Sequence, residues 1–285
     1  MASRIPPLLE PYLSLPPEAS LILLSGVLGS TTNWLVHRYL YTLLAPPPTP
    51  AVFDQEKKGG GGDINVILVS FLRDYAFWKD GAGRLGLDLD MSKRKGRFIF
   101  VDGLSDLFSA SSGHQPKPPA TNASGSRLLS SATAHALRKE LEDAIIQIQA
   151  VGPERQTVLV VDQLDLLLAA SGDDFSCNTL QETLLDLREK VHSAIITLSA
   201  DEPLIASQAT SLEKEHAAFA LSLAHDAHLV ISLRKLDTGT ARDVSGVLRA
   251  TSGGQSYDNS RSVDEGELLY FVGGDGAVRV FERGQ

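Results

Sequence analysis

The segment from Leu21 to Leu44 carries the residues whose order suggests a chemical role. Residues Leu21 to Gly26 (LILLSG) predict a short buried strand, and residues Thr32 to Leu44 (TNWLVHRYLYTLL) predict a helix. A strand, a loop and a helix in this order form the connection that holds nucleotide phosphates in NTPases, through loop amides and the positive end of the helix. The loop between them is therefore a candidate phosphate-binding loop.

This loop lacks the residues that would make it work. Gly26 fits the first position of the pattern G-x-x-x-x-G-K-[ST], but Thr31, Thr32 and Asn33 stand where glycine, lysine and serine or threonine are required. The missing lysine would reach the terminal phosphates, and loss of one such charge typically costs ~10²–10³ in rate. A β-branched threonine also cannot take the positive φ that the second glycine allows. The sequence therefore predicts a degenerate P-loop, with an NTPase-like fold but no NTPase function.

A second candidate is Asp162, which closes the apolar run TVLVVD. After a working phosphate loop, a carboxylate at this place would hold the water shell of a magnesium ion, so Asp162 is Walker-B-like. An aspartate at a strand end often only satisfies a turn, and without the lysine we favour that interpretation. Asp165 is expected to start a helix rather than to bind metal.

The densest basic cluster is formed by Lys93, Arg94, Lys95 and Arg97. These side chains are candidates to face an RNA phosphate backbone. The alternative is a solvated helix end, where cations interact favourably with the helix dipole.

The other reactive residue types form no recognisable site. None of the seven histidines has a carboxylate or serine at a spacing that suggests a triad, and the pair His225 and His228 resembles a metal motif that lacks further ligands. The single cysteine, Cys177, allows neither an intrachain disulfide nor a cysteine-based zinc site. We therefore expect no catalytic residues, no metal and no cofactor. The protein is accordingly predicted not to be an enzyme.

Composition limits the kind of partner. The chain has 285 residues, is 43% hydrophobic and carries 26 basic against 35 acidic residues, for a net charge of -9. The hydrophobic content suffices for one domain spanning residues 1–285. The negative charge opposes autonomous binding to nucleic acid, so such binding would need a local basic patch or partner subunits. Neither a signal peptide nor a transmembrane span is expected at the proline-rich N-terminus. We therefore predict a cytoplasmic protein, with the nucleus as an alternative further location.

Short apolar runs alternate with segments of helical period, which indicates an α/β fold with a mostly parallel central sheet and helices on both faces. Besides the first run, the predicted strands are Asn65 to Phe71, Arg97 to Asp102, Thr157 to Asp162, Ser193 to Ser199 and Ala227 to Leu233. Amphipathic helices are predicted over Ala132 to Val151 and Thr179 to His192, the second capped by Thr179.

The C-terminus predicts an antiparallel extension of this sheet. Strands over Leu268 to Val272 and Ala277 to Phe281 flank a glycine-rich hairpin turn, and Arg242 to Ala250 is expected to add a third strand. Two stretches, at about 45–63 and 109–127, are rich in proline, glycine and serine and are predicted to be disordered insertions. A polar segment, residues 252–267, is expected to form a loop.

Several segments in order resemble the Elongator complex protein 6 family, in a fungal form. They are LILLSGVLGSTTNWLVHRYL, VILVSFLRDYAFW, RLGLDLDMSKRKGRFIFVDGL, VLVVDQLDLLL and LAHDAHLVISLRKLDTGTARDVSGVLR. The resemblance covers nearly the whole chain outside the two insertions. Its strength lies in the order and spacing of the set, since no single motif is diagnostic.

The resemblance implies a RecA-like fold and a place in a ring. Family members form a heterohexamer with Elongator complex proteins 4 and 5, and this accessory ring joins the larger Elongator complex, whose catalytic subunit modifies the wobble uridine of tRNA. On this basis the chain would be a non-catalytic scaffold subunit that contacts tRNA through the assembled ring. The missing lysine agrees with a family that lacks intact nucleotide motifs.

Two other functions fit the same pattern. The chain could be an atypical ATPase in its own right, with Asp162 holding magnesium. It could also be a degenerate recombinase paralogue that binds DNA, although its acidic balance would leave DNA affinity to the Lys93 to Arg97 cluster.

Overall fold

A computed structural model describes residues 5–45, 64–105, 126–129, 131–170, 175–236, 241–254 and 263–283. Its centre is a sheet of ten strands in the order β10-β9-β8-β7-β1-β6-β5-β2-β3-β4. All pairings from β7 through β4 are parallel, and those that join β7, β8, β9 and β10 are antiparallel. The expected parallel sheet with an antiparallel C-terminal extension is confirmed.

The strands are β1 (Leu21–Gly26), β2 (Ile64–Ser70), β3 (Phe98–Asp102), β4 (Arg127–Leu128), β5 (Gln156–Asp162), β6 (Ser193–Ser199), β7 (Leu229–Arg234), β8 (Gly246–Ser252), β9 (Gly266–Val272) and β10 (Val278–Phe281). The α-helices are α1 (Glu10–Leu13), α2 (Asn33–Leu44), α3 (Tyr75–Arg84), α4 (Leu89–Arg94), α5 (Ala134–Val151), α6 (Leu166–Ala170), α7 (Cys177–Arg188) and α8 (Ser211–Asp226). A 3-10 turn, η1 (Pro7–Leu9), precedes α1, and a π-helical turn, η3 (Pro203–Ser207), precedes α8.

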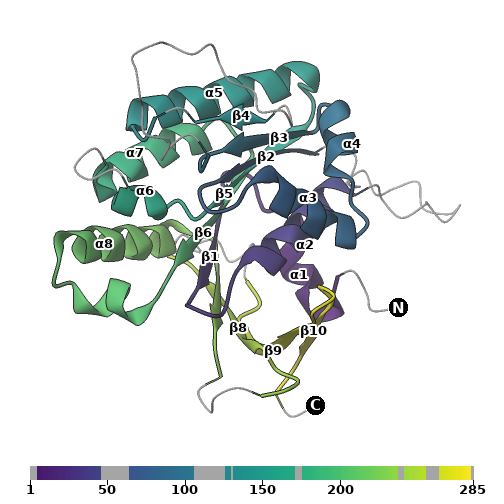
Figure 1. Ribbon diagram of the computed structural model, residues 1–285, viewed down its shortest axis with the longest axis vertical. Helices are drawn as coiled ribbons and strands as arrows, with labels where there is room; N and C mark the ends of the chain where they lie inside the picture. The colour runs from purple at the N-terminus through teal and green to yellow at the C-terminus, as the bar shows by residue number, and fades with distance from the viewer. Residues whose placement is uncertain are drawn as a thin grey trace, which may run out of the picture.

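The helices cover both faces of the sheet (Figure 1). On one face α1 to α4 pack against a core that includes Ile22 and Leu24, and on the other α5 to α8 pack against a core that includes Leu21 and Leu23. Successive side chains of a strand point to opposite faces, so each central strand contributes to both cores. This two-sided burial explains why the strand sequences are apolar without alternation.

Three expectations differ in detail from the structure. Helix α7 begins at Cys177 and is capped by Ser176, whose hydroxyl accepts from the Thr179 amide at 3.2 Å, so the predicted cap at Thr179 is wrong. The third antiparallel strand starts at Gly246 instead of Arg242 and ends at Ser252. Arg127, placed at the end of the second insertion, lies in β4 and forms an ion pair with Glu140 on α5. This pairing to β3 and α5 is long-range, and local composition does not reveal it.

The remaining parts of the two predicted insertions, residues 46–63 and 109–125, lie outside the described residues. In the predicted loop at 252–267, the last residue of β8 and the first two of β9 occupy the ends, and residues 255–262 also lie outside the described part. Among the described helices, none is both long and apolar enough to cross a membrane.

Candidate functional site

The loop between β1 and α2 closes on itself. An antiparallel bridge joins Val27 to Ser30, and the Ser30 amide donates to the Val27 carbonyl at 2.8 Å. Gly29 sits inside this turn with a φ of +85°, a value that favours glycine. A phosphate loop instead turns its amides towards an empty cradle. Here the Ser30 amide is already bonded to the loop's own backbone.

Gly26, which matches the first position of the pattern, serves this turn. A Cβ atom added there would lie 2.6 Å from the Ser30 carbonyl oxygen, and backbone cannot move aside as a flexible side chain can. The glycine is therefore needed for close approach of the loop to itself. Its presence carries no information about phosphate binding.

Two charged side chains hold the loop from outside. The Leu28 amide donates to the Asp201 carboxylate at 2.7 Å, so one loop donor already has an anionic acceptor from the segment after β6. The Lys235 side chain lies against Gly29, where its Cε is 2.3 Å from the place of an added Cβ. Leu28, at the tip, is 82% exposed. The bond to Asp201 stabilises the closed turn.

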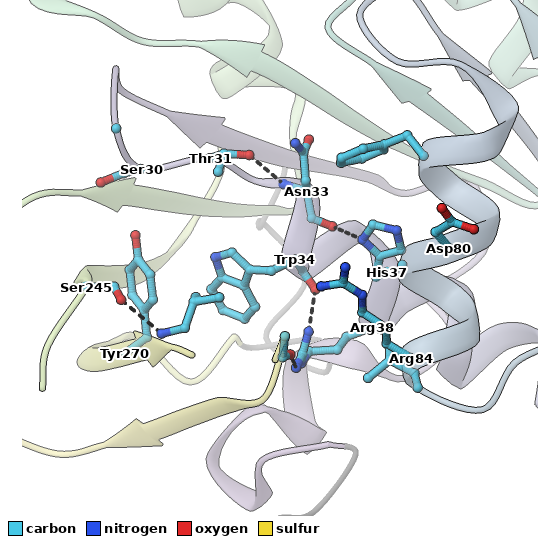
Figure 2. Close-up of a pocket in the computed structure, with 16 residues that line it drawn as sticks. Ser30, Thr31, Asn33, Trp34, His37, Arg38, Asp80, Arg84, Ser245 and Tyr270 are labelled. Atoms are coloured by element: carbon cyan, nitrogen blue, oxygen red, sulfur yellow. Dashed lines mark hydrogen bonds between the residues drawn. The ribbon is translucent and has the colours of Figure 1, made fainter. Parts of the chain in front are cut away.

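The three predicted P-loop positions at the start of α2 lie together at the N-terminus of the helix. Thr31 is exposed and its hydroxyl accepts from the Asn33 amide at 3.1 Å, as Figure 2 shows. Thr32, which occupies the lysine position, is only 2% exposed. A lysine at this position would have its long side chain inside the protein, so one substitution could not restore the site.

Asp162 lies at the carboxyl end of β5 and is fully buried. Its Oδ2 accepts from the Ser70 hydroxyl at 2.8 Å and its Oδ1 from the Thr197 hydroxyl at 3.0 Å. Burial raises the pKa of this carboxyl from 3.8 to about 6, although both hydroxyls and Arg73 oppose the shift. Each oxygen thus has a protein donor from a neighbouring strand. These partners lie on β2 and β6, so Asp162 links neighbouring strands and does not satisfy a turn as the sequence had suggested.

Asp165 precedes α6, as expected for a residue at a helix start, but its carboxylate makes long-range contacts. Its Oδ2 accepts from the Ser199 amide at 3.2 Å and lies 3.2 Å from Nε2 of His216 on α8. His216 is 4% exposed. The sequence did not single out His216, and only its position between apolar helix residues could have indicated burial. These groups thus form polar contacts with one another at the carboxyl ends of β5 and β6.

No cluster of three or more potential metal ligands occurs within the described ranges. The histidine pair near the start of β7 is separated, since His225 lies at the end of α8 beside Asp226 and His228 donates its amide to the Leu21 carbonyl.

The predicted basic cluster does not form one surface. Arg97 donates from its guanidinium to the carbonyls of Ile64, Leu44 and Leu43, each at 3.2 Å, and so links β2 to the end of α2. Lys93 lies over the Tyr75 ring at 5.4 Å. Arg94 and Lys95 are exposed at the end of α4. Arg97 is thus a structural residue, and the cations left for a partner are those at the end of the helix.

The sheet order and helix layers define a RecA-like α/β protein, and its phosphate-loop position is closed by its own backbone. A sequence model of the family Elongation complex protein 6 matches residues 61–270. The chain therefore belongs to the Elongation complex protein 6 family.

The sequences of individual relatives match this chain over most of their length. Elongator complex protein 6 of Xenopus laevis is 25% identical over 271 residues, covering 92% of this chain and 96% of that protein. The Elongator complex protein 6 homolog of Schizosaccharomyces pombe is 25% identical over 276 residues, covering 95% and 94%. The human Elongator complex protein 6 is 24% identical over 227 residues, covering 74% and 81%.

Asp162→Asn should change how stability depends on pH. Because the folded pKa is raised to about 6, the wild-type carboxyl contributes stability below pH 4 that is lost as the pH rises through 6. An amide does not ionise, so the variant does not lose this stability. Its free energy of unfolding should therefore rise relative to that of the wild type by up to about 3 kcal/mol between pH 4 and pH 7. Urea unfolding at both pH values measures this, with the exposed Asp243→Asn as control. An equal difference at both pH values would contradict the buried, high-pKa carboxyl.

Arg97→Ala should destabilise the fold, because it leaves three carbonyls without their charged donor. A loss of roughly 2 kcal/mol in unfolding free energy is expected from hydrogen bonds to a charged group. Lys95→Ala, two residues away and exposed, is the matched control and should change stability little. Equal stability of the two variants would show that Arg97 is not structural.

Proposed function

We propose that this chain is a non-catalytic subunit of a heterohexameric ring formed with Elongator complex proteins 4 and 5. The ring would support modification of the wobble uridine of tRNA by the larger Elongator complex, with the chain acting in the cytoplasm or nucleus. Membership in the Elongation complex protein 6 family supports the link to Elongator. The ring, its partners and the tRNA role are the proposed steps.

The observation that carries the non-catalytic part is the closed loop. The Ser30 amide is used within the loop, the Leu28 amide is bound by Asp201, and Thr32 is buried where a lysine would be needed. Asp162 is likewise bound on both oxygens. A nucleoside triphosphate would have to reopen the turn and displace these contacts before its phosphates could bind in the manner of a P-loop.

A scaffold role is consistent with the fold that remains. Heterologous interfaces close into rings, and a domain can keep the faces that seat its neighbours after its own phosphate site is lost. The net charge of -9 favours contact with tRNA through the assembled ring over contact by this chain alone.

Native mass spectrometry of the chain co-expressed with Elongator complex proteins 4 and 5 tests the proposal. We expect one heterohexamer with two copies of each chain, whereas the chain expressed without them should not form it. A chain that stays free of both partners would overturn the scaffold proposal.

The atypical ATPase makes an opposite prediction that is measured on the isolated chain. We expect no magnesium-dependent release of phosphate from ATP, and no difference between the wild type and Asp162→Asn, because both oxygens of Asp162 are already bound. Magnesium-dependent turnover that Asp162→Asn abolishes would favour the ATPase.

A further inference from the structure

A cavity of about 540 Å³ lies beside the closed loop, between α2, α3 and β9 (Figure 2). Its walls come from three places in the sequence: residues 29–38 of the loop and α2, residues 77–85 of α3, and the β9–β10 region with Ser245. Cavities of roughly 300–1,000 Å³ accommodate small organic ligands. It adjoins the position of the phosphate loop, because Gly29, Ser30, Thr31 and Asn33 are among its lining residues.

Three aromatic side chains, Trp34, Phe77 and Tyr270, are among its lining residues. Trp34 and Tyr270 lie with ring centroids 5.1 Å apart, and Phe77 faces the His37 ring at 5.7 Å. Burial lowers the pKa of His37 to about 4, so this imidazole is neutral at physiological pH. The walls therefore offer flat apolar surfaces from α2, α3 and β9 to a planar molecule.

Two guanidinium groups meet at one end of the cavity. Arg38 is 2% exposed, and it donates to the Trp34 carbonyl at 2.9 Å and to the Gly276 carbonyl at 3.2 Å. Arg84, from α3, places Nη1 within 3.9 Å of where a Cβ of Gly276 would lie. Both arginines thus converge on the same hairpin turn, and Figure 2 shows them beside each other.

This pair of cations lacks a counter-ion. In the described part of the chain, neither Arg38 nor Arg84 forms an ion pair, and Nε of Arg38 is buried without a partner. Asp80 is the one carboxylate among the lining residues, and it is exposed. Burial of a charge is costly, and buried charges usually pair with an opposite charge. Among the described residues, the buried Arg38 has only two carbonyl acceptors and the Trp34 ring, whose centroid lies 5.5 Å from its Cζ. In a chain with a net charge of -9, a cationic cavity is a local exception.

We propose that this cavity binds a small aromatic anion, a molecule with one phosphate or carboxylate on a flat ring system. The anion lies against Arg38 and Arg84, which present planar donors suited to both groups, and the rings lie against Trp34, Phe77 and Tyr270. Such a ligand supplies the missing counter-ion, and its rings contact the apolar walls of the cavity. The proposed binding involves no magnesium, and it does not depend on the ring proposal.

Isothermal titration calorimetry of the full-length chain tests this with four probes: adenosine 5′-monophosphate, uridine 5′-monophosphate, indole-3-acetate and adenosine. At least one of the three anions should bind with saturation and without magnesium, and adenosine should bind more weakly than its monophosphate. The phosphate and carboxylate probes show which anion the site prefers. Tryptophan fluorescence gives a second signal, because Trp34 lines the cavity and Trp78 is not among its lining residues.

Arg84→Ala is the decisive variant, because the side chain is exposed and its removal spares the core. It should weaken binding of the anion roughly ten- to hundred-fold and leave the weak binding of adenosine unchanged. Arg249→Ala removes an exposed cation outside the cavity and should bind like the wild type. Absence of saturable binding for all three anions would overturn the proposal, and so would equal affinity in Arg84→Ala and the wild type.

Discussion

Burial of the central strands on both faces is the constraint on which the rest of this structure depends. Strands β1, β5 and β6 lie between two helical layers, so polar groups at their carboxyl ends are remote from water. Buried polar groups must then find partners within the protein. Asp162 does so through the hydroxyls of Ser70 and Thr197, on the strands that flank β5. These contacts leave neither oxygen of Asp162 free.

The closed loop after β1 follows the same logic. Its turn uses Gly26 for close approach and Gly29 for a positive φ, and its exposed amide at Leu28 is bound by Asp201. A phosphate loop must keep such donors unbonded, which is energetically unfavourable when no ligand is present. Without the lysine, no tightly bound phosphate would offset the cost of unbonded amides in an open loop. A loop that satisfies its own donors is then the more stable form.

The apolar runs allowed the sheet to be predicted within about two residues at most strand ends, because two-sided burial gives an unambiguous sequence pattern. The β9–β10 hairpin was also predictable, since its turn requires glycine at Gly276, where φ is +82°. Contacts between distant segments were not predictable. Arg97 stood in a basic cluster, and only the fold shows that it reaches the end of α2. His216 gave no signal, because its partner Asp165 is 51 residues away in sequence.

Helix α2 shows why the cavity could not be found from the sequence. A surface helix normally turns its polar side chains to water, so His37 and Arg38 would be assigned to a solvated face. In the structure α3 and the β9–β10 turn cover that face, and both side chains are buried. Gly81 of α3 makes this possible, because an added Cβ would lie 2.0 Å from Nε2 of His37. The close approach of α3 desolvates a guanidinium that one-sided helix packing would have left in water. Arg38 then has two carbonyls and the Trp34 ring as partners but no anion within the described residues, which is the physical reason to consider the covered face of α2 as a binding surface.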